Sequence, residues 1–410
     1  MKRTTANLQQ VKGANQNLVF GHLYSQGPLS RADLTVVTRL SPTTVSSLVE
    51  GLIGEGLVEE QGLAETRTSG RKPRLLAILP RGRFVLSAEL TRNGFELGLF
   101  DLRCELIGSV VETVAAFSTI GPRLIQASEK LVEGQGLDMG RLGGVCVGAP
   151  ALIDPRSDIV IDSTVLPMEE KNDFMAILRG RFPGVPVRLD NESGLCGYAE
   201  KEYGAMRGLR DIIYIDINVG IGAGIILNGD LHRGSANLAG EIGHLSLDIN
   251  GPRCGCGNRG CMEMMANVPA LVGRVIQGLE SGRESVMRGT VDGNAGGVDL
   301  ETIRLAAQAE DSLALEAIDE TARYLASGIN SAMNLLDPEM VIIGGSMAEL
   351  GDPLFDRIEE HLSKMALKGK RPGRRIRRSE IRGGAAILGG ARLLVDGMLR
   401  QPELGHAVDE

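Results

Sequence analysis

Tryptophan is absent from this 410-residue chain, and aromatic residues make up only 3% of it. Apolar runs of membrane-spanning length are missing too, and the first residues, MKRTTANLQQVKG, lack the apolar core of a signal peptide. These absences predict a soluble, cytoplasmic protein without a membrane partner. The six cysteines fit a reducing compartment, because Cys104, Cys146 and Cys196 stand alone in apolar surroundings.

Glycine is abundant, with 55 residues, nearly twice its average share. Many glycines and few aromatics favour an α/β protein with tight turns and ligand-facing loops, and the length allows two or three domains. The net charge of −8 is unevenly distributed, because residues 1–80 hold nine basic and six acidic side chains. A basic N-terminal part on an acidic body indicates contact with nucleic acid.

Three helices are expected in this N-terminal part. Apolar residues recur at helical spacing between Asn15 and Tyr24. A second helix would begin after Ser30 as N-cap, with Leu34 and Val37 facing inward. The third would begin at Ser41 and Pro42, since proline suits the first helical position. Its apolar stripe consists of Val45, Leu48, Val49, Leu52 and Ile53.

The other face of the third helix carries short hydroxyl side chains, which suit base edges and phosphates in a DNA major groove. These residues are Thr43, Thr44, Ser46 and Ser47, with Ser41 at the start. Two short strands, 57–60 and 73–79, would flank a basic wing that contacts phosphates. Its cations are Arg67, Arg71, Lys72 and Arg74. We predict a winged helix-turn-helix over residues 1–80 that binds double-stranded operator DNA; a small helical domain with an ordinary basic turn is the alternative.

From Arg83 onward, short apolar segments typical of strands alternate with helical patterns, as in α/β domains. Strands are expected over 84–90, 95–101, 143–150, 186–190, 211–217, 222–228 and 340–345. Helices are expected over 121–134, 172–181, 193–203, 267–280, 301–309, 312–336 and 352–366. The stretch 280–297 lacks periodicity and is predicted to be a surface loop.

Cysteines and a histidine gather in one short stretch of the body. Cys254, Cys256 and Cys261, with His244 ten residues upstream, supply a Cys3His set that matches a closed structural zinc site. Gly255, Gly257 and Gly260 would provide the turns around the ion. The alternatives are a disulfide, for which a C-x-C pair is awkward, or unlinked buried thiols.

Several motifs together make the chain resemble the ROK family (repressors, open reading frames and kinases), in its repressor branch of the xylose-repressor type. They are LSPTTVSSLVEGLIGEGL, GIGAGIILNGDLHRGSANLAGEIGH, CGCGNRGCME and DPEMVIIGG. The resemblance covers nearly the whole length and implies an actin-like, two-lobed (RNase H-like) sugar-kinase fold behind the winged head. One lobe would span 81–190 and the other 191–410, with the last helix, about 385–400, packing back on the first lobe.

The resemblance also implies ligands. In ROK proteins the residues that match the Cys3His set bind structural Zn²⁺. The glutamates of the E-x-G-H and G-C-x-E motifs, here Glu241 and Glu263, hydrogen-bond sugar hydroxyls, and carboxylates suit that role because each accepts several hydrogen bonds. His244 would use one ring nitrogen for the metal and the other toward the sugar. Asn191 and Glu192 would hold further hydroxyls; solvated surface carboxylates are the alternative.

The phosphate cradle of ROK kinases, D-x-G-G-T-K, has no counterpart here. The equivalent stretch, ELTRNGFELGLFD (89–101), has neither the glycine pair nor the lysine. Glu192 replaces the catalytic aspartate of the kinases and is one methylene longer, which can misplace the base. The glycines of 218–224 and 342–345 remain, although tight turns need glycine anyway. We therefore assign no catalytic residue and predict a degenerate kinase scaffold.

The sequence thus predicts a sugar-responsive DNA-binding transcriptional regulator, a repressor that acts as a homodimer or dimer of dimers. An ATP-dependent sugar kinase with a fused DNA-binding head is the first alternative, and a regulator whose body only dimerises is the second. The basic stretch 368–382 is expected to be a solvated loop, with contact to DNA phosphates as the alternative.

Overall fold

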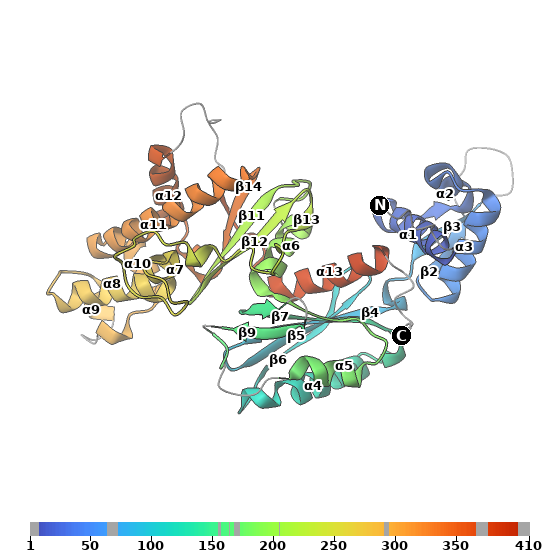
Figure 1. The fold of residues 1–410 in the computed structure, drawn as a ribbon, viewed down its shortest axis with the longest axis horizontal. Coiled ribbons are helices and arrows are strands. Elements are labelled where there is room, and N and C mark those ends of the chain that lie inside the picture. Colours follow the sequence, from blue (N-terminus) through green and yellow to red (C-terminus); the bar gives the residue numbers. More distant parts are fainter. Residues whose placement is uncertain are drawn as a thin grey trace. The chain divides into compact units, whose positions relative to one another are not determined.

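The computed structural model describes residues 8–63, 73–154, 157–163, 165–167, 173–204, 206–290, 295–365 and 376–400 (Figure 1). The chain divides into two compact units. Unit 1 consists of Met1–Ala149, Pro167–Asp190 and Gly390–Glu410, and unit 2 of Pro150–Leu166 and Asn191–Gly389. None of the helices in the described ranges is long and apolar enough to cross a membrane.

The head has three helices and a small antiparallel sheet with the strand order β1-β3-β2. Its elements are α1 (Leu8–Gln26), β1 (Leu29–Ser30), α2 (Arg31–Thr38), α3 (Pro42–Gly54), β2 (Val58–Leu63) and β3 (Arg74–Ile78). Three helices followed by a β-hairpin confirm the predicted element order of a winged helix. The hairpin tip, residues 64–72, lies outside the described residues.

Side chains fix the starts of α2 and α3. The Ser30 hydroxyl accepts a hydrogen bond from the Asp33 N–H at 3.1 Å, and the Asp33 carboxylate accepts one from the Ser30 N–H at 2.9 Å. This is a capping box. Ser41 accepts from the Thr44 N–H at 3.2 Å, and Pro42 occupies the first helical position. Both N-caps expected from the sequence are confirmed.

The head core contains residues from outside the head. The predicted α3 stripe is buried as expected, except that Ile53 is only half-buried. Leu102 from the body is also fully buried in this core, and Met398 and Leu399 pack against it. The expectation for Val37 is wrong: its side chain is 38% exposed, and Thr38 is buried instead. Thr38 tolerates burial because its hydroxyl donates to the Leu34 carbonyl at 2.5 Å.

The rest of unit 1 is a five-stranded sheet with the order β10-β7-β4-β5-β6. Its strands are β4 (Phe84–Thr91), β5 (Gly94–Asp101), β6 (Leu106–Thr113), β7 (Leu142–Ala149) and β10 (Val187–Asn191). Helices α4 (Ile120–Gly134) and α5 (Phe174–Arg181) cover one face and α13 (Ala385–Arg400) the other (Figure 1). Helix α13 approaches closely because β7 offers glycines, and a Cβ on Gly144 would lie 2.8 Å from Leu394.

Unit 2 is built on a second five-stranded sheet with the order β13-β12-β11-β14-β15. Its strands are β11 (Ile212–Ile217), β12 (Ile221–Leu227), β13 (Asp230–Leu231), β14 (Met340–Gly344) and β15 (Ile376–Arg378). Around it lie α6 (Glu192–Tyr203), α7 (Met262–Ala266), α8 (Val268–Glu280), α9 (Met287–Thr290), α10 (Leu300–Gln308), α11 (Ser312–Leu336) and α12 (Asp352–Met365). The small hairpin β8 (Leu152–Asp154) and β9 (Ile159–Asp162) also belongs to this unit.

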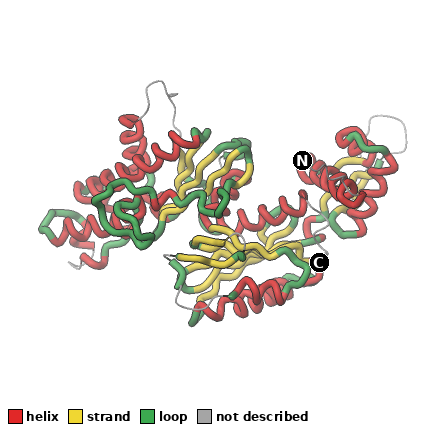
Figure 2. Tube along the Cα trace, in the orientation of Figure 1, coloured by secondary structure: helices red, strands yellow, loops and turns green. Residues whose placement is uncertain are grey.

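The two sheets have one topology. In each, three consecutive strands form an antiparallel meander, and the fourth strand pairs in parallel with the first. The fifth strand then lies beside the fourth. Figure 2 shows the strands of each sheet with helices around them. This repeated topology is the actin-like fold of two related lobes that the sequence predicts, and every helix and strand expected in the body is present.

Two loop expectations are wrong. Within 280–297 the structure has helix α9, and Met287 of this helix is 1% exposed in the core of unit 2. The described part of this stretch therefore packs against the core and is not a surface loop. Within 368–382, Ile376 is buried and β15 pairs in parallel with β14, which makes the described end of the basic stretch part of the sheet. Residues 366–375 lie outside the described ranges. The predicted boundaries at residues 80 and 190 stay a prediction.

Candidate functional site

Four potential metal ligands converge in unit 2. The ligand atoms of His244, Cys254, Cys256 and Cys261 all lie within 4.8 Å of one another. The Cys256 and Cys261 sulfurs are 3.6 Å apart, and the Cys254 sulfur is 3.7 Å from Nδ1 of His244. Thiolates bound to a tetrahedral zinc at ~2.3 Å stand about 3.8 Å apart, so the spacing fits such an ion. The cluster can bind a metal.

Turns rather than regular structure bring the cysteines together. The Cys254 N–H donates to the Asn258 carbonyl at 2.9 Å, and the Gly257 N–H donates to the Cys254 carbonyl at 3.0 Å. Gly257 has a φ of 93° and Gly260 a φ of 60°, a backbone region that favours glycine. Gly255 also lies within this turn, but it has neither a positive φ nor a close neighbour, so its position does not require glycine.

His244 presents its two ring nitrogens to different groups. Nδ1 faces the Cys254 sulfur, and Nε2 lies 3.9 Å from a carboxylate oxygen of Glu241. Both residues belong to the tight turn that contains the 3-10 helix Ile242–His244. The predicted double role of the ring, with one nitrogen toward the metal and the other toward a sugar, stays a prediction.

Glu263 is close enough to Glu241 to affect the pKa of the Glu241 carboxyl. Burial raises the pKa of the Glu241 carboxyl, His244 lowers it, and Glu263 raises it again. Glu263 is 7% exposed, and its Oε2 accepts a hydrogen bond from the Ile221 N–H at 3.0 Å. One oxygen of Glu263 is thus used to hold the start of β12. This anchoring role was not foreseen from the sequence.

Asn191 and Glu192 lie where β10 ends and α6 begins. Asn191 is the N-cap of α6 and accepts a hydrogen bond from the Gly194 N–H at 3.3 Å. Its amide also donates to the Ala151 carbonyl at 3.3 Å. Glu192 follows in the first turn and is half-buried. These contacts position both residues at the N-terminus of α6, and their predicted binding of sugar hydroxyls stays a prediction.

The predicted DNA-binding residues divide into three groups. Thr43 and Ser47 are exposed on α3, whereas Thr44 and Ser46 are half-buried. Ser41 is exposed but caps α3 and lies 2.9 Å from the Thr43 hydroxyl. In the wing, Arg74 forms an ion pair with Glu60 at 2.5 Å. The other predicted wing cations, Arg67, Arg71 and Lys72, lie outside the described residues.

Two loops lie within the stretches that the resemblance to ROK kinases relates to phosphate binding, 89–101 and 218–224. Thr91 pairs with Gly94 across a two-residue turn, and a Cβ on Gly94 would lie 1.9 Å from the Glu112 carbonyl oxygen. In the second loop, the Asn218 amide oxygen accepts hydrogen bonds from the N–H and hydroxyl of Ser346, at 2.7 and 2.9 Å. The backbone N–H of Ser346, which could bind a phosphate, therefore already has a partner.

The Asn218 amide nitrogen donates in turn to Asp216 at 3.0 Å. Burial raises the pKa of Asp216 to about 6, while hydrogen bonds from Tyr214 and Asn218 oppose that rise. The amide therefore links the buried end of β11 to the loop after β14. Sequence reasoning noted the glycines of this loop but missed Asn218, whose short polar side chain within a Gly-rich turn was the available signal.

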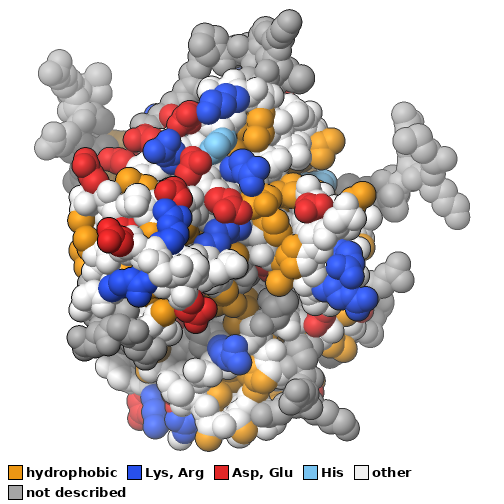
Figure 3. All heavy atoms as spheres, turned by 90° about the vertical axis from the view of Figure 1, so that its left-hand side faces the viewer, with side chains coloured by type: hydrophobic (Ala, Val, Ile, Leu, Met, Phe, Trp, Pro, Cys, Tyr) orange, Lys and Arg blue, Asp and Glu red, His pale blue; other side chains and the backbone are white. Residues whose placement is uncertain are grey.

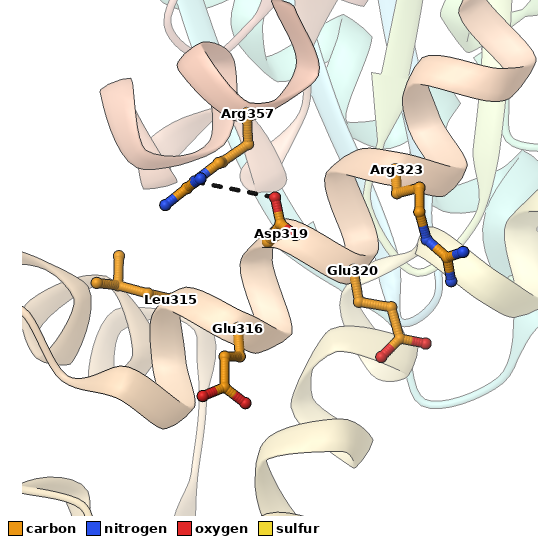
Figure 4. A pocket seen from close by; sticks show the side chains of 6 residues that line it. All are labelled: Leu315, Glu316, Asp319, Glu320, Arg323 and Arg357. Atoms are coloured by element: carbon orange, nitrogen blue, oxygen red, sulfur yellow. Dashed lines mark ion pairs between the residues drawn. The ribbon is translucent and has the colours of Figure 1, made fainter. Parts of the chain in front are cut away.

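A surface groove of about 430 Å³ lies between α11 and α12 (Figure 4). Its charged lining is paired: Glu316 with Arg283 at 2.7 Å, and Asp319 with His361 at 3.0 Å and with Arg357 at 3.9 Å. Figure 3 shows the same mixing of acidic and basic side chains on a wider face. The groove contains no predicted site residue, and its three carboxylates all have cationic partners, Glu320 with Arg274 at 3.4 Å, so it does not indicate a ligand site.

Comparison with known proteins agrees with this arrangement. The sequence profile of the ROK family matches residues 88–396 of this chain. A xylose repressor of Bacillus spizizenii is 30% identical over 369 residues, which cover 86% of this chain and 87% of that protein. The DNA-binding transcriptional dual regulator NagC of Escherichia coli is 29% identical over 405 residues, covering 98% of this chain and 97% of that protein.

A similar arrangement occurs in a solved structure, a ROK family transcriptional regulator described as a homologue of the E. coli MLC protein. It superimposes with a TM-score of 0.82 at 26% identity, and the match covers 95% of this chain and 97% of that one. The likeness therefore includes the head as well as the two lobes. Since the family model spans most of the chain and a 30% identical relative is covered almost throughout, this chain belongs to the ROK family.

Proposed function

We propose that this protein is a sugar-responsive transcriptional regulator, a repressor that binds operator DNA through α3 and its wing. The observation that carries the proposal is the combination of a winged head with a ROK body, which matches a solved ROK regulator over 95% of the chain. Xylose repressors and NagC, which resemble the chain at similar identity, support regulation of carbohydrate genes.

DNA binding would combine two kinds of contact. The exposed hydroxyls of Thr43 and Ser47 on α3 are suited to base edges, whereas Arg74 and the rest of the wing would contact phosphates without reading sequence. Two heads in a dimer would bind two half-sites, and a sugar that changes their spacing would weaken the match to the operator. A homodimer or dimer of dimers follows from this proposal.

The direct test is a DNA-binding titration at several salt concentrations, using DNA upstream of neighbouring genes. It is repeated with D-xylose and N-acetylglucosamine, because similar regulators are named for these sugars, and with D-glucose, which a similar ROK glucokinase binds. We expect sequence-selective binding that one sugar changes by at least about fivefold, the lower end of ordinary coupling between sites. Absence of selective binding at every salt and sugar condition would contradict the proposal.

For the metal, we propose structural Zn²⁺ bound by His244, Cys254, Cys256 and Cys261. Three sulfurs and one imidazole at these spacings suit zinc, and four protein ligands leave no open position for catalysis. When bound, the ion would fix the loop that joins the two glutamates of the sugar site. His244, Glu241 and Glu263 would then hold hydroxyl groups, together with Asn191 and Glu192.

Replacing Glu241 with glutamine tests the sugar site. The amide keeps the size of the side chain but removes the charge that strengthens hydrogen bonds from hydroxyls. We expect sugar affinity to fall roughly 10- to 100-fold, as for loss of a hydrogen bond to a charged group. The measurement is the sugar-induced rise in melting temperature, with the exposed Glu280→Gln in α8 as control. Equal sugar stabilisation of Glu241→Gln and the control would remove Glu241 from the site.

We further propose that kinase activity has been lost. The tight Thr91–Gly94 turn and the Asn218–Ser346 bridge support this, because the first loop is a two-residue hairpin turn without a glycine pair or a lysine, and the Ser346 N–H of the second already has a partner. We expect no stabilisation by an ATP analogue with Mg²⁺, and no ATP turnover on hexoses, aminosugars or pentoses. Turnover that Glu192→Gln abolishes would support the alternative, a sugar kinase with a DNA-binding head.

A further inference from the structure

Helix α13 is shared by the two units. It runs without interruption from Ala385 to Arg400, yet its first residues, up to Gly389, group with unit 2 and the remainder with unit 1. An α-helix is stiff along its axis, because each turn is held by backbone hydrogen bonds. A displacement at one end of α13 is therefore passed along the helix to the other end.

Two adjacent glycines, Gly389 and Gly390, lie where α13 passes from the residues of unit 2 to those of unit 1. A Cβ on Gly389 would lie 1.9 Å from the backbone oxygen of Leu195 in α6, which belongs to unit 2. A Cβ on Gly390 would lie 2.3 Å from the Ser87 hydroxyl in β4, which belongs to unit 1. Both distances are shorter than any side chain tolerates, so the helix backbone rests directly on each neighbour.

A buried carboxylate joins α6 to the segment that leads into α13. Glu200 is 1% exposed near the end of α6. Its Oε1 accepts hydrogen bonds from the N–H groups of Glu380 and Ile381, at 3.0 and 3.1 Å, and from the Ser379 hydroxyl. Three hydrogen bonds to one buried carboxyl group tie the segment 379–381 to α6. The other end of α6 begins with Asn191 and Glu192.

The residues of α13 that follow Gly390 contact the head. The Arg392 guanidinium donates to the Tyr24 hydroxyl of α1 at 2.7 Å and lies 5.1 Å from the centre of its ring. Asp396 fixes that guanidinium through contacts of 2.9 and 3.1 Å. Burial raises the pKa of Tyr24, so the phenol stays neutral and accepts the hydrogen bond. Met398 and Leu399 add apolar packing against the head core.

We propose that α6 and α13 couple the sugar site to the head, with Arg392 and Tyr24 as the positioning pair that fixes α1. The inference rests on the proposed function and adds the residues through which a sugar would regulate DNA binding. A change at Asn191 and Glu192 moves α6, Glu200 and Gly389 carry the shift to α13, and Arg392 carries it to Tyr24. Each step is a contact between directly packed groups.

The first test needs neither DNA nor sugar. Gly389→Ala forces α13 away from α6, and Ser379→Ala removes the hydroxyl contact to Glu200 with little risk to folding. Hydrogen–deuterium exchange is measured in α1 peptides covering residues 14–26. We expect exchange in α1 to rise about tenfold in Gly389→Ala, as when a hydrogen bond to a charged group is lost, and severalfold in Ser379→Ala.

The matched control is Gly273→Ala, a glycine within α8 of unit 2 where a Cβ would meet nothing within 4 Å. It should leave α1 unchanged. The inference is overturned if α1 exchanges at the same rate in Gly389→Ala, in Ser379→Ala and in this control. That outcome holds whether or not the protein binds DNA. In an Arg392→Met background, the effect of Gly389→Ala on α1 should disappear, because the last link is already broken.

The second test uses DNA. Tyr24→Phe keeps the ring and removes the hydroxyl, so sugar-free DNA affinity should stay within about twofold while the sugar-induced change in affinity falls about tenfold. Tyr24→Phe and Arg392→Met combined should do no more than either alone. A full sugar response in Tyr24→Phe overturns the role of the pair. If the unmodified protein binds no DNA selectively, the proposed function fails, while the exchange experiment still decides the coupling.

Discussion

Replacing Cys261 with serine is expected to strip the protein of its metal and to unfold the loop between His244 and Cys261. Cys261 is fully buried and lies 3.6 Å from the Cys256 sulfur. A serine hydroxyl is a poor zinc ligand, and structural zinc contributes about 10–16 kcal/mol of apparent binding energy in small peptides. Even a quarter of that, about 3 kcal/mol, would lower the melting temperature by about 3–4 °C in a chain of 410 residues, because the shift falls as chain length rises.

The measurements are the zinc content per chain and the melting temperature, and a chelator should reproduce both effects in the unmodified protein. Burial raises the pKa of Cys254 and Cys261, so metal binding must release protons, and metal affinity should fall as the pH falls. Cys196→Ser is the matched control, since Cys196 is a buried cysteine of α6 that lies outside the cluster and forms no disulfide. One zinc per chain in Cys261→Ser would contradict the site.

The loss should extend to the sugar site. Glu241 and His244 lie at the start of the loop that carries the metal ligands, residues 244–261. Glu263 lies just after the end of this loop, in α7. Without the ion, the backbone that holds the two glutamates at a fixed spacing is free to separate. Sugar-induced stabilisation should therefore vanish in Cys261→Ser, while Cys196→Ser keeps it.

Placing a glutamate at Ser47 is expected to abolish operator binding. Ser47 is exposed on α3, on the face opposite the buried Val45, Leu48 and Val49 stripe, so the substitution should not disturb the fold. A carboxylate at this position would repel the phosphates on both sides of a groove and remove a hydroxyl contact. Together these effects should weaken binding at least about 100-fold.

Ser312→Glu provides the same chemical change on the body, at an exposed first position of α11. It adds an acidic side chain where the helix dipole favours one, so stability should not fall. Fluorescence anisotropy with labelled operator DNA at fixed salt compares the two variants. Wild-type affinity in Ser47→Glu would show that α3 is not the recognition helix, whereas loss in both variants would indicate a general effect of charge.

Local signals were sufficient for the regular elements. Helix α11 has the bounds expected from the sequence, 312–336, because its helical apolar period is unbroken over 25 residues; in the structure Asp311 caps its start. Ser30 and Ser41 similarly fixed the starts of α2 and α3. The residues of the metal cluster were identifiable because thiol and imidazole ligands at short spacing have few other uses in a reducing compartment.

Features that depend on long-range contacts were not predictable in the same way. Strand β15 is three residues long within a basic stretch, and only its pairing with β14 makes it a strand. Edge strand β6 exposes four of its eight residues, Val111 among them, and fully buries none, so its sequence lacks a clear alternation of apolar and polar residues. The roles of Asn218 and Glu200 need partners 128 and about 180 residues away, which no local pattern encodes.

The composition of the head core has a practical consequence for work with fragments. Leu102, Met398 and Leu399 complete this core, although they lie far from the winged helix in the sequence. Cutting the chain after residue 80 would expose an apolar patch on the isolated head. It would also remove Arg392, which donates a hydrogen bond to Tyr24. Affinity measured on such a piece would describe a loosened molecule, and swapping heads between related repressors would require exchanging the C-terminal helix with them.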